Sequence, residues 1–117
     1  MTKNANEAEE AFEIPHDMKV YYLRFLKRSP LWTPEETPEV MRLQAAHLAY
    51  GRKLHEAGTL ILNGPLLDNG DLRGVDIFRV GSLEEAQALS DADPAVQAGR
   101  LVSEIHPWMI HKGTLPE

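Results

Sequence analysis

The segment Val40–Leu67 constrains the fold most, because an amphipathic helical pattern runs there directly into an apolar strand. Pro38 follows Thr37 as proline does at the first position of a helix, and Gly58 supplies the residue that ends one. Between them, residues at steps of three and four share one helix face: Val40, Leu43, His47, Tyr50, Leu54 and Ala57. The spacing therefore predicts a helix from Pro38 to Gly58.

Strand patterns lie on both sides of this helix. Residues 18–27 are rich in β-branched and aromatic types and contain no breaker. Residues 59–67 form a second strand, in which Asn63-Gly64-Pro65 predicts an edge or a bulge because proline cannot donate to a sheet ladder. A turn signal at residues 68–71 then predicts a hairpin with a third strand at residues 72–80.

The last third of the chain predicts a second helix and a fourth strand. Ser82-Leu83-Glu84-Glu85 is a capping box that opens the helix. Asp93-Pro94 is a good N-cap followed by a good first residue, so a further helical turn begins there. Residues 100–111 form the final strand, which we expect to be broken or bent at Pro107-Trp108.

The order β-α-β-β-α-β is that of the ferredoxin-like α+β fold, with four antiparallel strands and two helices on one face. No helix remains to cover the other sheet face. We expect that face to be partly apolar, and a second copy of the sheet is its economical cover. The sequence thus predicts a homodimer packed through its sheet faces, using Tyr21, Leu23, Phe25, Phe78 and Val80.

Length, charge and composition limit the number of domains and the classes of partner that this chain can have. The chain of 117 residues suits one domain. We expect that domain at residues 18–112, between an acidic tail at 1–17 and a short tail at 113–117. A net charge of −6 argues against nucleic acid or an anionic membrane as partner. Cysteine is absent, which excludes disulfides and thiol chemistry. Without an apolar span or a secretory signal, a cytoplasmic protein is the default expectation.

Histidines are the main candidates for chemistry. His47 lies in the apolar stripe of the helix, and burying a titratable ring costs free energy unless a partner satisfies it. On position alone, such a histidine is more often a satisfied core residue than a catalytic one. His55 lies near the helix end and is expected at the surface. His106 and His111 face opposite sides of a strand, so no shared metal site is expected. No cofactor motif is present.

Several short motifs together resemble one known family. The first half carries His47-Leu48-Ala49, Leu54-His55-Glu56-Ala57-Gly58 and Asn63-Gly64-Pro65-Leu66; the second carries Ser82-Leu83-Glu84-Glu85-Ala86, Asp91-Ala92-Asp93-Pro94 and Ala98-Gly99. In order and spacing they resemble the YciI-like (YCII-related) domain over residues 18–112. The resemblance implies a ferredoxin-like fold in dimeric α+β barrels and enzymes that act on small molecules. It also implies a catalytic pair of a helix histidine and the aspartate of an Asp-Pro motif, here His47 and Asp93.

Such a dyad suits acid–base chemistry, because an aspartate that accepts from one ring nitrogen leaves the other nitrogen as a base. We expect cofactor-free proton transfer on a small cyclic or aromatic compound, as isomerisation, elimination or dehalogenation. Gly64 is a candidate backbone donor to a substrate oxygen, and further candidate substrate-binding residues are Pro65, Tyr22 and Trp108. The alternative is a non-catalytic ligand-binding or interaction module on the same barrel, because a fold alone does not separate the two.

Overall fold

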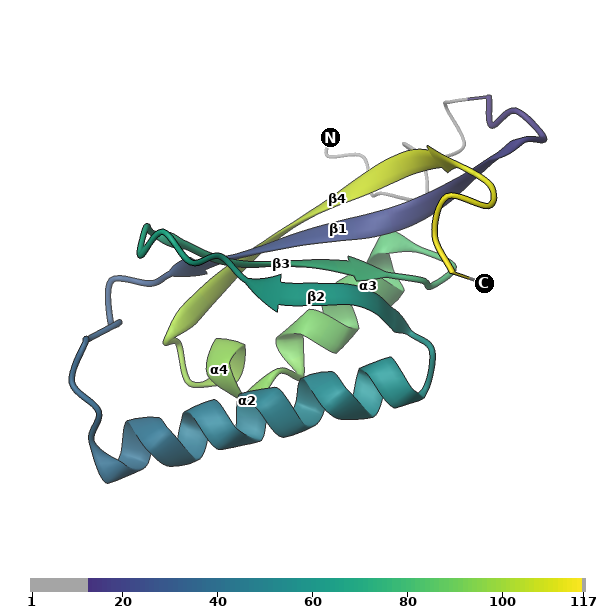
Figure 1. Ribbon diagram of the computed structural model, residues 1–117. Coiled ribbons are helices and arrows are strands. Elements are labelled where there is room, and N and C mark those ends of the chain that lie inside the picture. The colour runs from purple at the N-terminus through teal and green to yellow at the C-terminus, as the bar shows by residue number, and fades with distance from the viewer. Residues whose placement is uncertain (1–12, 117) are drawn as a thin grey trace.

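The computed structural model describes residues 13–116, and within them one sheet carries all helices on a single side (Figure 1). The elements in chain order are β1 (Met18–Arg28), α2 (Pro38–Glu56), β2 (Leu60–Pro65), β3 (Leu72–Phe78), α3 (Leu83–Asp91), α4 (Pro94–Gln97) and β4 (Leu101–His111). The four strands of this sheet lie in the order β2-β3-β1-β4, and every neighbouring pair is antiparallel. The predicted α+β, ferredoxin-like fold is confirmed.

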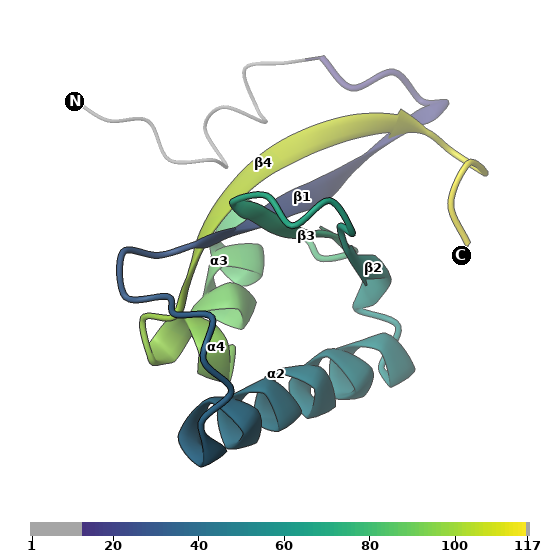
Figure 2. The same ribbon diagram turned by 60° about the vertical axis from the view of Figure 1, so that its left-hand side comes forward.

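Helix α2 forms where the sequence pattern placed it. Thr37 is the N-cap, and its hydroxyl accepts a hydrogen bond from the Val40 amide at 3.2 Å. The helix ends at Glu56. Gly58 follows with a left-handed φ of 78°, which glycine adopts without strain because it has no Cβ. Of the predicted stripe, Leu54 is buried and only Ala57 is exposed. The stripe packs against β2 and α4, so α2 presents its inner face to the sheet (Figure 2).

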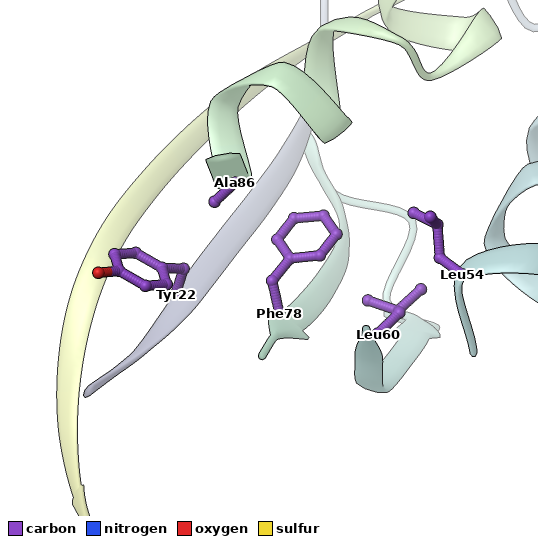
Figure 3. Packing of buried hydrophobic residues seen from close by; sticks show 5 residues of the cluster. All are labelled: Tyr22, Leu54, Leu60, Phe78 and Ala86. Carbon is purple, nitrogen blue, oxygen red and sulfur yellow. The ribbon is translucent and has the colours of Figure 1, made fainter. Parts of the chain in front are cut away.

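The hydrophobic core lies between the sheet and helices α2 and α3. Its largest fully buried side chains are Tyr22 and Phe78, which face each other across β1 and β3. Figure 3 shows these rings with the other members of the cluster, Leu54, Leu60 and Ala86. A smaller cluster of Leu26, Ala95 and Leu101 lies at α4. The gap between the two clusters is bridged by charged side chains described below.

Two proline positions in the strands behave according to their place at the sheet edges. Pro65 is the last residue of the edge strand β2, so the predicted edge is confirmed, whereas the irregular pairing lies between Leu60 and Leu62. The predicted break or bend at Pro107 does not interrupt β4, which pairs with β1 continuously from Leu101 to His111. An edge strand tolerates proline because the missing N–H faces away from the ladder.

The sheet face without helices differs from the prediction in two residues. Phe78 and Val80 were expected there, but both pack on the helix side, because Phe78 pairs with Tyr22 and shares its face. The predicted members Tyr21, Leu23 and Phe25 alternate with these and point to the open face. Trp108 pairs with Tyr21 and is 45% exposed. The open face is therefore partly apolar along β1 and β4, where Glu104 and His106 lie among the apolar side chains and Tyr21 is only 1% exposed. Its cover by a second copy stays a prediction.

The two predicted tails are described only in part. Residues 1–12 of the N-terminal tail and residue 117 lie outside the described part of the chain. At the boundary, the Lys112 amide donates to the Asp17 carbonyl at 2.8 Å, which closes the β1–β4 end of the sheet. Across residues 13–116, no helix is both long enough and apolar enough to cross a bilayer.

Candidate functional site

His47 and Asp93 come together although they are 46 residues apart in sequence. His47 projects from the inner face of α2, and Asp93 lies at the junction of α3 and α4. The Nδ1 atom of His47 lies 2.8 Å from Oδ1 and 3.0 Å from Oδ2 of Asp93. The Asp93 side chain is 1% exposed, and that of His47 is 19% exposed. A buried carboxylate therefore holds a ring that solvent still reaches.

The Asp93 carboxylate is fixed by its own helix. As the N-cap of α4, it accepts a hydrogen bond from the Ala95 amide through Oδ1 at 3.0 Å. Pro94 supplies the first residue of α4, where its missing N–H has no intrahelical partner to lose. The Asp-Pro sequence thus serves two purposes at once. It starts a helix, and it aims a carboxylate at α2.

Arg24 joins this pair to the sheet. It lies on the helix side of β1 and is 4% exposed. Its Nε donates to Oδ2 of Asp76 at 2.7 Å, and its Nη2 forms an ion pair with the same oxygen. Its Nη1 donates to Oγ of Ser90 at 3.1 Å and to Oδ2 of Asp93 at 3.3 Å. One guanidinium therefore links two buried carboxylates on different elements.

Neither Arg24 nor Asp76 was a candidate from sequence. A signal was nevertheless present, because each stands between apolar residues on the inner face of a strand, where charged side chains are rare unless paired. The register of β1 with β3 places Arg24 directly opposite Asp76. That register was not determined by either strand alone, so the pair was missed.

The two carboxylates respond differently to burial. Burial raises the pKa of Asp76 above its ordinary value, against the opposing effect of Arg24. Burial also opposes ionisation of Asp93, but His47, the Ala95 amide and Arg24 together hold the pKa of Asp93 below its ordinary value. Asp93 is therefore ionised at neutral pH and acts only as an acceptor. In a neutral ring it binds the Nδ1–H tautomer of His47, which leaves the lone pair of Nε2 available to accept a proton.

Tyr50 lies one helical turn from His47 on α2. Its hydroxyl donates to the Leu89 carbonyl at 2.8 Å, which ties α2 to α3. Burial and the nearby charge of Asp93 raise the pKa of the Tyr50 phenol, while Arg24 opposes them. Tyr50 is therefore a neutral donor at physiological pH. Its hydrogen bond fixes the position of α2 relative to α3, and so helps to place His47 next to Asp93.

Two adjoining cavities reach the dyad. The larger, of about 510 Å³, lies between α2, the β2–β3 hairpin and α4, and its apolar lining residues include Trp32, Leu43 and Leu101. The smaller, of about 280 Å³, reaches Arg24 and Asp93. His47 and Asp76 line both cavities. The lining of the larger cavity mixes apolar side chains with polar and charged ones, and its volume lies within the range of about 300–1,000 Å³ that is usual for small-molecule sites.

The predicted substrate-binding residues fall into two groups. Gly64 and Pro65 line the larger cavity, on the wall formed by β2. Tyr22 lies in the core cluster, and Trp108 lies on the open sheet face, so neither borders the two cavities. Among residues 13–116, no three histidine, aspartate or glutamate side chains gather as metal ligands would.

Comparisons with known proteins agree with this architecture. The family model of the YCII-related domain matches residues 20–109. No curated protein matches the chain. Among solved structures, the chain resembles 5-chloro-2-hydroxyhydroquinone dehydrochlorinase from Burkholderia phenoliruptrix AC1100, in complex with 2,5-dihydroxybenzoquinone, with a TM-score of 0.57. That alignment has 24% sequence identity and covers 75% of this chain and 92% of the other, so it supports the fold.

Proposed function

Because the chain belongs to the YCII-related domain family, we propose that it is a small-molecule enzyme whose His47 transfers a proton while Asp93 holds the ring. One observation carries the proposal. A buried carboxylate, ionised at neutral pH, contacts Nδ1 of a histidine that borders two cavities. A positioned base with a fixed tautomer is the arrangement that general acid–base catalysis requires.

In the proposed reaction, Nε2 of His47 removes a proton from a substrate carbon or hydroxyl group. Asp93 stabilises the imidazolium that forms, because its charge lies within hydrogen-bond distance of the ring. In an isomerisation, the electron pair of the broken bond moves into a conjugated carbonyl, and His47 returns the proton at a second carbon. In an elimination, that pair forms a double bond while the leaving group departs with its own electrons. Neither reaction needs an electron carrier.

The cavity supports a substrate the size of a single ring. Its volume of about 510 Å³ accommodates such a ring. Its lining combines apolar side chains such as Trp32 with polar ones such as Gln44 and Asn63, which suits a ring that carries polar substituents. Gly64 and Pro65 form the opposite wall in this proposal, with Gly64 as a backbone contact. The name of the similar structure states a dehydrochlorination of a hydroxylated ring, which favours elimination among the proposed reactions.

We also propose that the catalytic unit is the domain at residues 18–112 and that it works as a homodimer. The open sheet face would pack on its counterpart in a second copy. This proposal rests on the exposed apolar side chains of that face, such as Trp108 and Val102, each 45% exposed. A dimer of this kind leaves α2 on the outer side of each sheet (Figure 2).

The test is proton exchange in deuterated buffer, followed by NMR on a panel of lactones and halogenated hydroxybenzenes. His47→Asn should reduce exchange or turnover by about 10²-fold or more, because general-base catalysis contributes roughly 10²–10⁴. His111→Asn is the matched control, since the His111 side chain is 73% exposed and lies away from both cavities and from the open sheet face. Both variants should keep the wild-type circular dichroism spectrum.

Two results would decide against an enzyme. Full activity in His47→Asn would remove the base from the mechanism. Saturable binding of a panel compound with neither exchange nor turnover would favour the alternative, a ligand-binding module that uses the same cavity.

A further inference from the structure

Only one of the two carboxylate oxygens of Asp76 takes part in its ion pair with Arg24. It lies on the helix side of β3, is 5% exposed and faces Arg24 across the register. Both Nε and Nη2 of Arg24 converge on Oδ2. Arginine–carboxylate pairs frequently use both carboxylate oxygens in a parallel fork. Here the second oxygen, Oδ1, accepts no hydrogen bond from residues 13–116.

That second oxygen is not fully enclosed by the protein. Within the described part of the chain, two fully buried side-chain atoms lack a hydrogen-bond partner, the Tyr21 hydroxyl and Nε of Arg28. Oδ1 of Asp76 also accepts no hydrogen bond, but it is not among these fully buried atoms, so it is in contact with solvent. Asp76 borders both cavities together with His47. An unpaired carboxylate oxygen thus reaches the cavity from the sheet, while the imidazole reaches it from α2.

The electrostatic surroundings restrict what this oxygen can bind. In the two cavities that Asp76 borders, the charged or titratable side chains are Arg24, Glu36, His47, Tyr50, Arg52, His55, Glu56, Arg73, Asp93 and Arg100. Arg24 is already shared between Asp76 and Asp93. A neutral hydroxyl group is complementary to Oδ1 in either protonation state of Asp76, because it can donate to a carboxylate and accept from a carboxylic acid.

We propose that Oδ1 of Asp76 accepts a hydrogen bond from a hydroxyl group of the substrate, and that the substrate is therefore a ring with a free hydroxyl. This inference rests on the proposed function, because it names the substrate class of that same cavity. Asp76 binds the hydroxyl on the sheet side, and His47 moves a proton on the α2 side. Asp76 thus determines specificity, and Arg24 positions it through Oδ2.

Equilibrium binding tests the proposal without any need for turnover. The probes are hydroquinone and 1,4-dimethoxybenzene, which share a ring but differ in the two hydroxyl donors, and their affinities are measured by NMR titration. Wild-type protein should bind hydroquinone at least about tenfold more tightly, since a hydrogen bond to a charged group gives roughly that factor or more. Equal affinity for the two probes would overturn the proposal, and this arm requires no variant.

Asp76→Asn is the second arm, because asparagine keeps the size of the side chain and an oxygen for Arg24. It should lose most of the preference for hydroquinone. Asp91→Asn is the control, since Asp91 is exposed and bonds Gln87 at 3.0 Å away from both cavities. An unchanged preference in Asp76→Asn would overturn the assignment.

The two proposals fail separately. If exchange depends on His47 but both probes bind equally well, the acid–base function stands and the role of Asp76 falls. If hydroquinone is preferred through Asp76 but no proton exchanges, the role of Asp76 stands and the catalytic proposal falls.

Discussion

Replacing Arg24 with methionine removes the cation that holds two buried carboxylates together. Arg24 is 4% exposed, and it bonds Asp76, Asp93 and Ser90 at once. Methionine fills much of the space of the arginine stem but offers no donor. Asp93 keeps its bonds to His47 and Ala95, whereas Asp76 loses every hydrogen bond it accepts within residues 13–116.

The expected loss of stability is large. Breaking a buried ion pair by removing one partner costs about 3–5 kcal/mol, because the remaining charge is left without compensation in a low-dielectric site. This is a large part of the roughly 5–15 kcal/mol that holds a domain of ordinary stability. Urea unfolding followed by circular dichroism measures it as a lower midpoint at an unchanged slope.

The stability lost in Arg24→Met should also depend on pH, which gives a second test. Burial raises the pKa of Asp76 in the folded protein, so the contribution of Asp76 to stability falls as pH rises through the folded pKa. Without Arg24 this effect should grow. The deficit of Arg24→Met is therefore expected to be greatest at neutral pH and to shrink as the buffer is made acidic and Asp76 takes up a proton.

The control is Lys27→Met on the same strand. Lys27 pairs with Glu104 at 3.1 Å, but both side chains are more than two-fifths exposed, and exposed pairs contribute little. Its midpoint should hardly move. If Arg24→Met unfolds at the same urea concentration as Lys27→Met at pH 7, the Arg24 network does not stabilise the fold and the reasoning above is refuted.

Three further outcomes are expected. Asp93→Asn should lose the most stability at pH 7, and this loss should shrink as pH falls below about 3.8, the ordinary pKa of an aspartate. The reason is that the pKa of Asp93 is lowered in the folded protein, so its ionised form stabilises the fold until it is protonated. An equal loss of stability at pH 7 and pH 3 in thermal unfolding would contradict this. Gly58→Ala should cost about 1–2 kcal/mol, since φ is 78° there, whereas Gly51→Ala within α2 should stabilise by up to about 1 kcal/mol; chemical denaturation of the pair compares them, and equal effects would exclude the left-handed cap as the cause. Trp108→Glu should convert a dimer into a folded monomer in light scattering, and a wild-type protein that is already monomeric would disprove the sheet-to-sheet dimer.

Local sequence was sufficient for the elements and their order. Steps of three and four, with Thr37-Pro38 before them and Gly58 after them, predicted α2 to within two residues of its end at Glu56. The Asp93-Pro94 cap predicted α4 for the same reason. These features depend on propensities and caps that act within one turn of the chain, so they can be recognised without knowledge of the rest.

The errors arose where the environment of a residue depends on a distant segment. Pro107 was expected to interrupt a strand, but its place at the edge of the sheet removes the conflict. Phe78 was assigned to the open face because its pairing with Tyr22 was unknown. A strand side chain reaches one face or the other according to register, and a single sequence does not specify register.

The candidate site was likewise predicted only in part from the sequence. The sequence determined that His47 lies on the inner face of a helix and that Asp93 starts another, and the family resemblance paired them. Only the tertiary structure placed Arg24 opposite Asp76 and put both at the cavity beside the imidazole. The physical reason is distance along the chain. Helix caps and apolar stripes are properties of neighbouring residues, whereas a buried charge finds its partner 52 or 69 residues away through sheet order and register.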